Sequence, residues 1–314
     1  DIIHKAIENH VNFSCEASVG GGIPILMPLH QSLAANQIES IVGILNGTTN
    51  YILSQMTETG VNYADALADA QKQGFAEADP TNDVCGFDAA RKLAILSSIG
   101  FRANVTFDDV LVEGIEKIDK SDIQYAKEMG YTIKLLTVAL RQENGIALNV
   151  YPAFLPDDHP LSSVKGSYNA IYVTGNIVDD VMFYGRGAGA LPTASAVMGD
   201  VISTAQHILN GSTGTGMIMT DTKRIPFYSS LKLQNSYYFR LDVDDVTGVL
   251  SQIASAFAEH EISICEVVQK RKAKGVAELV LITEMASRES ILHVEKALQV
   301  LPCMRKVANV IRVM

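Results

Sequence analysis

The last part of the sequence shows the pattern that most restricts its fold. Apolar strand-like segments and amphipathic helix-like segments alternate there in the order strand, helix, strand, strand, helix, strand. The predicted strands are 237–243, 262–270, 277–284 and 307–314, and the predicted helices are 246–260 and 288–301. This βαββαβ order over about 80 residues predicts a ferredoxin-like sandwich at residues 230–314.

A change of composition separates this unit from the rest of the chain. Residues 210–216 read Asn-Gly-Ser-Thr-Gly-Thr-Gly, which predicts a linker at 210–229. From about residue 23 to 207, strand and helix patterns alternate, so we expect an α/β (α+β) domain with a mixed sheet. The predicted strands are 11–15, 38–45, 106–112, 132–141, 148–154, 170–174 and 180–184, and the predicted helices are 51–59, 63–73, 86–99 and 192–209.

Composition limits the partners and the location of the protein. Its 314 residues predict two domains, and 25 basic against 35 acidic residues leave a net charge of −10. That charge argues against a nucleic acid or an anionic membrane as partner. No apolar run reaches the roughly 18 residues that a membrane helix needs. The four scattered cysteines are typical of a reducing compartment and show no zinc-site spacing, so we expect a soluble cytoplasmic protein.

The stretch from 74 to 95 carries the densest set of ionisable side chains. Several acids precede an apolar helix, on which Asp88 and Lys92 lie four residues apart on one face. One interpretation is an acidic helix start with an exposed ion pair. The other is a lysine partly surrounded by apolar residues, whose pKa responds to burial and neighbouring carboxylates, so that it can donate a proton to an oxygen.

Three glycine-containing turns leave structural and functional interpretations open. Residues 185–189, before the predicted helix at 192, could present N–H groups to a phosphate or could be a plain turn; they lack the GxGxxG fingerprint. Residues 16–24 offer one carboxylate and several carbonyls to a monovalent cation, or form a hinge. Residues 46–50 supply small donors for a polar ligand, or an N-cap.

Several motifs in one order give the chain a family resemblance. Residues 16–24, 43–51, 76–80, 88–92 and 187–194 resemble the motifs of homoserine dehydrogenase, and together they span most of residues 10–205. The βαββαβ unit resembles an ACT domain, which is appended to many bacterial members. The resemblance implies NAD- or NADP-dependent interconversion of L-aspartate 4-semialdehyde and L-homoserine, on the route to threonine, methionine and isoleucine.

The resemblance also assigns roles to single residues. Lys92 would donate a proton to the carbonyl oxygen, with Asp88 beside it. The substrate's amino-acid end would be held, or Lys92 oriented, by Thr48, Glu77, Asp83 and Asp88. The cofactor would approach Gly74 and Gly189. A sodium ion would be bound by Glu16 and the backbone oxygens of Val19, Gly21 and Ile23, and an amino-acid effector, most simply L-threonine, near Asp245 and Gly248.

One departure from the family pattern shapes the expected domain organisation. The family's nucleotide-binding domain precedes the matched region, and its pattern is not in this sequence. We therefore interpret residues 1–15 as a remnant of that domain, 16–209 as the substrate and dimerisation domain, and the chain as the C-terminal part of a longer protein that is inactive alone. The resemblance implies a homodimer or homotetramer. The alternative is a non-catalytic amino-acid-binding and oligomerisation module.

Overall fold

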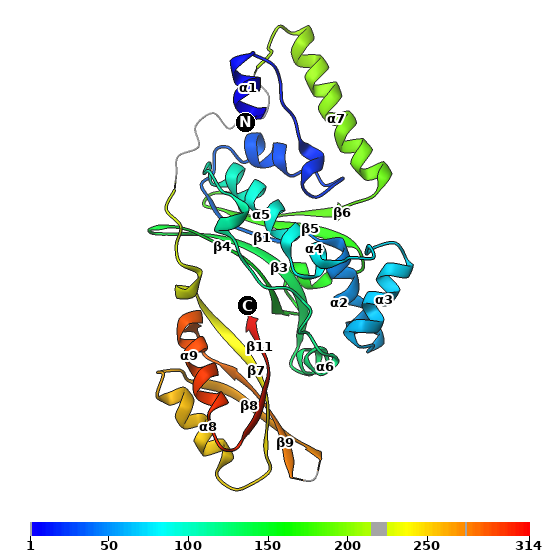
Figure 1. Cartoon of the computed structure of the whole chain (residues 1–314). Coiled ribbons are helices and arrows are strands. Elements are labelled where there is room, and N and C mark those ends of the chain that lie inside the picture. Colours follow the sequence, from blue (N-terminus) through cyan, green and yellow to red (C-terminus); the bar gives the residue numbers. More distant parts are fainter. Residues whose placement is uncertain (1, 215–224, 274) are drawn as a thin grey trace.

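The computed structural model describes residues 2–214, 225–273 and 275–314. Figure 1 shows an elongated molecule with one sheet running through its middle, helices α2 to α6 beside it, α7 near one end and a smaller unit at the other end. Residues 215–224, which belong to the predicted linker at 210–229, lie outside the described residues.

The first part of the chain follows the predicted alternation closely. Its helices are α1 (Ile2–Glu8), α2 (Gly47–Thr59), α3 (Tyr63–Lys72), α4 (Thr81–Val84), α5 (Phe87–Gly100), α6 (Lys120–Glu128) and α7 (Ala190–Leu209). Its strands are β1 (Ile38–Ile44), β2 (Leu111–Val112), β3 (Tyr131–Gln142), β4 (Gly145–Pro156), β5 (Tyr168–Gly175) and β6 (Asp179–Arg186). Short helical turns occur at Glu16–Ser18, Pro28–Ser32, Phe107–Asp109 and Pro160–Ser163.

Two predicted strands of this part are wrong. Residues 11–15 form no strand, although Val11 and Phe13 alternate with polar residues; the segment crosses beside α7 rather than pairing with the sheet. Within 106–112, Phe107–Asp109 form a 3₁₀ turn, because the side chain of Thr106 and that of Asp109 cap each other's backbone, and of these seven residues only Leu111 and Val112 belong to a strand. The helices α4 and α6 were not predicted.

The C-terminal unit has the predicted βαββαβ order. It consists of β7 (Gln234–Asp244), α8 (Val249–Ala258), β8 (Ile264–Ala273), β9 (Val276–Thr283), α9 (Arg288–Gln299) and β11 (Met304–Val313), with a two-residue strand β10 (Ala286–Ser287) and a 3₁₀ turn at Ser230–Lys232. Its own core lies between the sheet and the two helices, around Phe239, Phe257 and Val294. The periodicity was sufficient here because every element is local and amphipathic.

The strands of both units belong to one sheet among the described residues. Its main path is β6-β5-β1-β3-β4-β11-β7-β9-β8, with β2 also paired to β4 and β10 to β7. β11 runs parallel to β4, with Arg312 opposite Ala153 and Val313 opposite Phe154. The main core continues across this junction, since Tyr238, Val280 and Ile311 pack with the apolar residues of the first unit.

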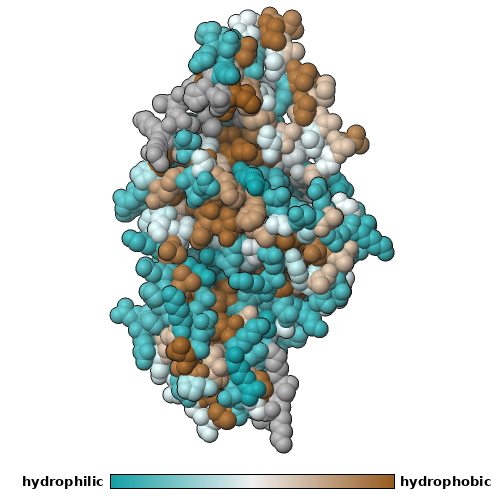
Figure 2. All heavy atoms as spheres, in the orientation of Figure 1, coloured by the Kyte–Doolittle hydropathy of each residue, from teal (hydrophilic) through white to brown (hydrophobic). Residues whose placement is uncertain are grey.

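Helix α7 differs from the other long helices because none of its residues is buried. Its exposed apolar side chains include Leu191, Val197, Met198, Val201, Ile202, Ile208 and Leu209. Figure 2 shows apolar residues along this end of the molecule. An apolar patch of this kind is typical of an interaction surface. In the described part of the chain, no helix is both long and apolar enough to cross a membrane.

Candidate active site

A cavity of about 460 Å³ lies where α2, α4 and α5 meet the turn that follows β6. It is lined by Asn46, Gly47, Thr48, Gly74, Phe75, Asp83, Asp88, Lys92, Ser167, Arg186, Gly187, Ala188 and Gly189. Six residues named from the sequence, Thr48, Gly74, Asp83, Asp88, Lys92 and Gly189, therefore meet in one place. They come from segments up to about 140 positions apart, so only the fold brings them together.

The ion pair predicted on α5 is present and faces the cavity. Lys92 Nζ lies 2.7 Å from Asp88 Oδ2 and donates a second hydrogen bond, 3.0 Å long, to the carbonyl oxygen of Leu45. The two side chains are 21% and 31% exposed, so they are neither solvated freely nor sealed in the core. An ammonium fixed by two acceptors on one side can direct its remaining proton into the cavity.

Asn46 holds the two carboxylates of the cavity side by side. Its Nδ2 donates to Asp83 Oδ1 at 2.7 Å and to Asp88 Oδ2 at 2.8 Å, while its Oδ1 accepts from the Thr49 backbone and caps α2. Sequence analysis recognised the N-cap at 46–50, but not that the same side chain would join two acids. Only a contact between segments about 40 residues apart reveals that role.

A buried lysine binds a side chain near the N-terminal end of α2. Lys134, which is 2% exposed, donates to Asn50 Oδ1 at 3.0 Å and to the carbonyl oxygen of Val164. Burial, and secondly the charge of Lys165, lower the pKa of Lys134 to about 8. Thr48, at the same end of α2, donates to the Phe75 carbonyl oxygen at 2.6 Å and so fixes the turn that carries Gly74.

The glycine turns at 20–22 and 187–189 pack directly against each other. A Cβ on Gly21 would lie 2.4 Å from the Gly187 carbonyl oxygen, and one on Gly187 would lie 2.2 Å from Asn169 Cγ. Gly22 N–H donates to the Arg186 carbonyl oxygen at 3.0 Å. Residues 20–22 are thus a close-packed contact rather than a free hinge. Gly74 and Gly189 are less crowded: a Cβ on Gly74 would meet nothing within 4 Å, and one on Gly189 would meet only Pro192 at 3.4 Å, an ordinary contact distance.

Glu16 is buried, and its carboxylate accepts three hydrogen bonds from the backbone. Its two oxygens accept N–H bonds from Ile25, Leu26 and Met27 at 2.6 to 2.8 Å. The carbonyl oxygens of Val19, Gly21 and Ile23 receive no backbone hydrogen bond from the described residues. Unpaired carbonyls suit a hard cation, whereas no group of three or more His, Cys, Asp or Glu suited to a metal occurs in the described ranges.

Two charged residues differ from the sequence expectation. Glu77 is exposed and is not among the residues that line the cavity; its backbone carbonyl oxygen accepts from Gln71 Nε2 at 3.0 Å. Arg186 does line the cavity, although sequence analysis considered only the glycines around it. Its guanidinium lies 4.9 Å from the centre of the Tyr168 ring, directly across the β5–β6 pair. The cavity therefore has two cations, Lys92 and Arg186, and two carboxylates.

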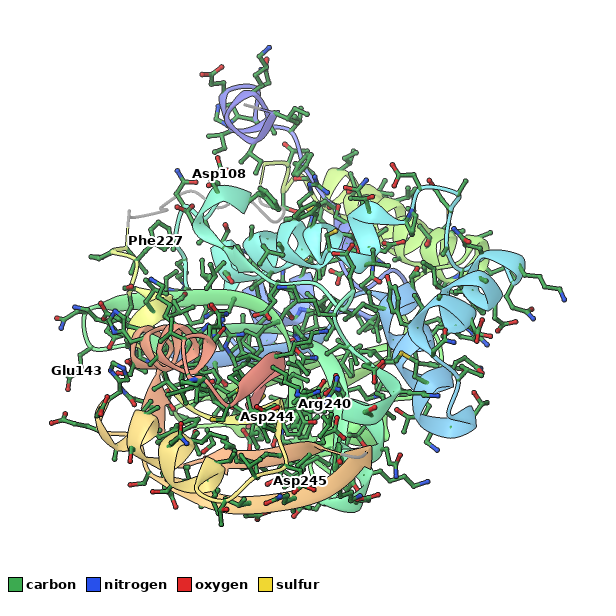
Figure 3. The ribbon with its side chains drawn as sticks, turned by 60° about the horizontal axis from the view of Figure 1, so that its bottom comes forward. Asp108, Glu143, Phe227, Arg240, Asp244 and Asp245 are labelled. Carbon is green, nitrogen blue, oxygen red and sulfur yellow. The ribbon has the colours of Figure 1, made fainter. Side chains whose placement is uncertain are left out.

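The turn into α8 carries Asp245 and Gly248, the two residues that the sequence analysis named for an amino-acid effector. Gly248 is the N-cap of α8 with φ of 89°, and a Cβ there would meet nothing within 4 Å. Asp245 is partly buried, and its backbone N–H donates to the Gly275 carbonyl oxygen at 3.2 Å. The next residue back, Asp244, pairs with Arg305 at 2.6 Å. Figure 3 labels Asp244 and Asp245 in the lower half of the view.

Fold and cavity together define a class of protein. A lysine fixed by a carboxylate beside open glycine turns is suited to proton transfer in an enzyme of small polar molecules, and a ferredoxin-like unit is joined to it through a continuous sheet.

Comparison with known proteins makes the assignment specific. Residues 24–202 match the family model for homoserine dehydrogenase and residues 237–303 the model for the ACT domain. The homoserine dehydrogenase of Corynebacterium glutamicum is 42% identical over 96% of this chain and 68% of its own length, and that of Bacillus subtilis is 40% identical over 100% and 72%. The crystal structure from Thiobacillus denitrificans matches with a TM-score of 0.94 at 36% identity, covering 100% of this chain and 72% of that one.

The chain belongs to the homoserine dehydrogenase family of oxidoreductases and carries an ACT domain. These comparisons confirm the family and fold class indicated by the sequence motifs, and they do not favour the non-catalytic alternative. A homoserine dehydrogenase mutant from a hyperthermophilic archaeon, in complex with NADPH, matches with a TM-score of 0.57 at 28% identity, covering 65% of this chain and 59% of that one.

Proposed function

We propose that this cavity binds L-aspartate 4-semialdehyde or L-homoserine and that Lys92 is the proton donor and acceptor of their interconversion. The observation that carries the proposal is the position of Lys92, whose Nζ is fixed between Asp88 and the Leu45 carbonyl oxygen on the cavity wall. Such a group lowers the barrier by giving its proton to the oxygen on which negative charge develops.

The remaining charges of the cavity match an amino acid. Asp83, held by Asn46, would accept the substrate ammonium, with the hydroxyl of Thr48 beside it; Asp88 would orient Lys92. Arg186, for which the described residues offer no carboxylate partner, would bind an anionic group, most simply the substrate carboxylate. Glu77 would join the site only if the turn that bears it moved inward.

A nicotinamide cofactor, NAD or NADP, would supply the hydride in this reaction. Gly74 and Gly189 fit its approach because neither position has a side chain, and Gly189 begins a helix of 20 residues whose N-terminus favours an anionic group. As the hydride reaches the carbonyl carbon, the Lys92 ammonium would protonate the carbonyl oxygen. The resulting neutral amine would regain a proton from solvent.

Three further assignments belong to the proposal. A sodium ion would be held by Glu16 and the carbonyl oxygens of Val19, Gly21 and Ile23, with Glu16 also fixing the loop through its bonds to residues 25–27. The ACT domain, at residues 230–314, would bind an amino-acid effector, most simply L-threonine, at the turn of Asp245 and Gly248. The substrate domain would span 16–209 and residues 1–15 would belong to a nucleotide-binding unit, in a homodimer or homotetramer in the cytoplasm.

The test is steady-state turnover by the complete gene product. L-Aspartate 4-semialdehyde and NADPH are supplied, and oxidation of the cofactor is followed by absorbance. We expect turnover by the parent protein and a loss of at least about 10²-fold in kcat for Lys92→Met. Lys72→Met, on the exposed end of α3, is the matched control and should retain parental kinetics. No turnover by the parent, or a folded Lys92→Met variant within tenfold of it, would refute the proposal.

A further inference from the structure

We propose that Arg312, on the last strand of the ACT domain, is a positioning residue for the substrate cavity and acts through Glu113 on the turn that carries Asp83. This inference rests on the proposed function, because it takes Asp83 to be a substrate-binding residue. It goes beyond that function in making the C-terminal strand of the regulatory domain part of the support of the active site.

Arg312 belongs to the ACT domain but is held by residues of the first domain. β11 is hydrogen-bonded to β4 at this point, and Met314 N–H donates to the Phe154 carbonyl oxygen at 3.0 Å. The Arg312 guanidinium donates to Glu113 Oε2 at 2.9 Å and lies 4.1 Å from the centre of the Tyr151 ring. With 8% of its side chain exposed, Arg312 is clamped between a ring and a carboxylate.

Glu113 follows β2, which lies on the same edge of β4 as β11. β2 pairs with β4 at Asn149 and Val150, and β11 pairs with it at Ala153 and Phe154, so the two strands occupy neighbouring parts of one edge. Glu113 N–H donates to the Val150 carbonyl oxygen at 2.8 Å. The Arg312–Glu113 ion pair therefore joins β11 to the end of β2, between the β2–β4 and β11–β4 pairings.

The residues after Glu113 are in backbone contact with α4. Ile115 N–H donates to the Val84 carbonyl oxygen at 2.9 Å. A Cβ on Gly114 would lie 2.3 Å from that same oxygen and 2.6 Å from Cys85 Cα, so only glycine allows the two segments to approach this closely. A displacement of 113–115 must consequently displace Val84, because no side chain lies between the backbones to absorb it.

This backbone contact is one of several restraints on α4. The helix has four residues, and a helix of one turn is not stable by itself, so contacts with its neighbours set its position; they include the bonds Thr81 N–H to Asp79 and Arg91 to Asn82. Asp83, which precedes Val84, faces the cavity and accepts from Asn46. On the other side of Val84, Gly86 packs against Val112 and Val150, since a Cβ added to Gly86 would lie 3.1 Å from a side-chain carbon of each. Gly86 leads into α5, the helix of Asp88 and Lys92.

A merely structural interpretation of the pair predicts a different result. If Arg312 and Glu113 only joined the domains, their loss would reduce stability and the fraction of active enzyme, and would leave the KM for L-homoserine unchanged. If they position Asp83, their loss raises that KM while the KM for NADP⁺ stays at the parental value, because Asp83 would contact the amino-acid substrate and not the cofactor. The split between the two KM values separates the interpretations.

The experiment measures L-homoserine oxidation by NADP⁺ with the complete gene product, without added effector. Arg312→Gln and Glu113→Gln should each raise the KM for L-homoserine about tenfold, a coupling of ordinary size, and the double variant should be no worse than either single variant. Arg312→Lys, which keeps the charge but not the planar guanidinium that lies over the Tyr151 ring, should give an intermediate KM. The matched control is Arg305→Gln, which removes an exposed arginine–carboxylate pair of the same domain and should leave both KM values unchanged.

The outcomes are distinguishable. If the parent does not oxidise L-homoserine, the proposed function fails and the inference fails with it. If the parent is active and both Arg312→Gln and Glu113→Gln keep the KM values of Arg305→Gln, the inference alone is overturned. Glu113, whose side chain is 34% exposed, provides the second variant should Arg312→Gln not fold.

Discussion

The buried ion cluster between α6 and the ACT sheet allows a quantitative prediction for Arg240→Met. Asp122 is fully buried and accepts from Arg240 Nε at 2.7 Å, from Asn309 Nδ2 at 2.7 Å and from Tyr238 OH at 3.1 Å. Arg240 also lies 3.5 Å from Glu278. Arg240, a residue of β7 that is labelled in Figure 3, is only 7% exposed.

Removing the arginine leaves two buried carboxylates without their cation. Breaking a buried pair from one side costs about 3–5 kcal/mol, because the remaining charge stays desolvated. Tyr238 still donates to Asp122, since burial and then the charge of Asp122 raise the pKa of its hydroxyl. We therefore expect Arg240→Met to lower the free energy of unfolding by about 3–5 kcal/mol.

The double variant Arg240→Met/Asp122→Leu should cost less than the sum of its two single variants. It removes both charges of the Arg240–Asp122 pair. Glu278 stays without this cation, and the Tyr238 hydroxyl and the Asp119 N–H lose their acceptor, each at a cost of about 1–3 kcal/mol, while Asn309 keeps its bond to the Lys117 carbonyl oxygen. The measurement is equilibrium urea unfolding followed by circular dichroism. Arg305→Met, at an exposed pair, should cost less than about 1 kcal/mol. A loss below about 1 kcal/mol for Arg240→Met, or additive single variants, would refute the reasoning.

Three further predictions concern a proton, an ion and a ligand. The pKa of Lys134 is lowered to about 8 from 10.5, so between these pH values the unfolded chain binds more protons than the folded protein, and this group makes the free energy of unfolding rise with pH. The rise, measured by urea unfolding, should be smaller in Lys134→Met. Equal slopes in the parent and the variant would contradict the expectation. Replacing tetramethylammonium by sodium at constant ionic strength should raise the melting temperature if the carbonyl oxygens of Val19, Gly21 and Ile23 bind the ion, and equal melting temperatures would exclude it. Calorimetric titration with L-threonine should give heat with the parent chain and none with Gly248→Trp, whereas identical titrations would remove Gly248 from the effector site.

The ion pair of the cavity could be predicted because it is local. Asp88 and Lys92 are four positions apart on one helix, so a helical periodicity suffices to place them together. Asn46 and Arg186 line the same cavity but come from distant segments, and no spacing in the sequence predicts such a contact. Glu77 was included by family resemblance, and its side chain is exposed in this arrangement of the turn after Gly74.

The prediction of secondary structure failed where a polar segment forms a helix that begins at a capping box. The helix α6 begins with Asp119 and Asp122 in a reciprocal capping box, a signal that the sequence does contain. It was missed because Lys120 to Glu128 has few apolar residues on which a periodicity could be seen. The same Asp122 binds Arg240 of the ACT sheet, so a residue of weak local signal carries much of the contact between domains.

The sheet explains why the two halves of the chain should be treated as one mechanical unit. A linker rich in glycine, serine and threonine predicts independent domains, yet β11 is paired to β4 and the main core includes residues of both units. β4 offers one edge to two strands, β2 from the first domain and β11 from the second, and Arg312 and Glu113 pair where these strands come together. An effector that shifts β11 along β4 must therefore either carry Glu113 with it or break an ion pair whose arginine is buried. Each alternative changes the support of α4, which is the physical condition for the effector and the substrate to influence each other's binding.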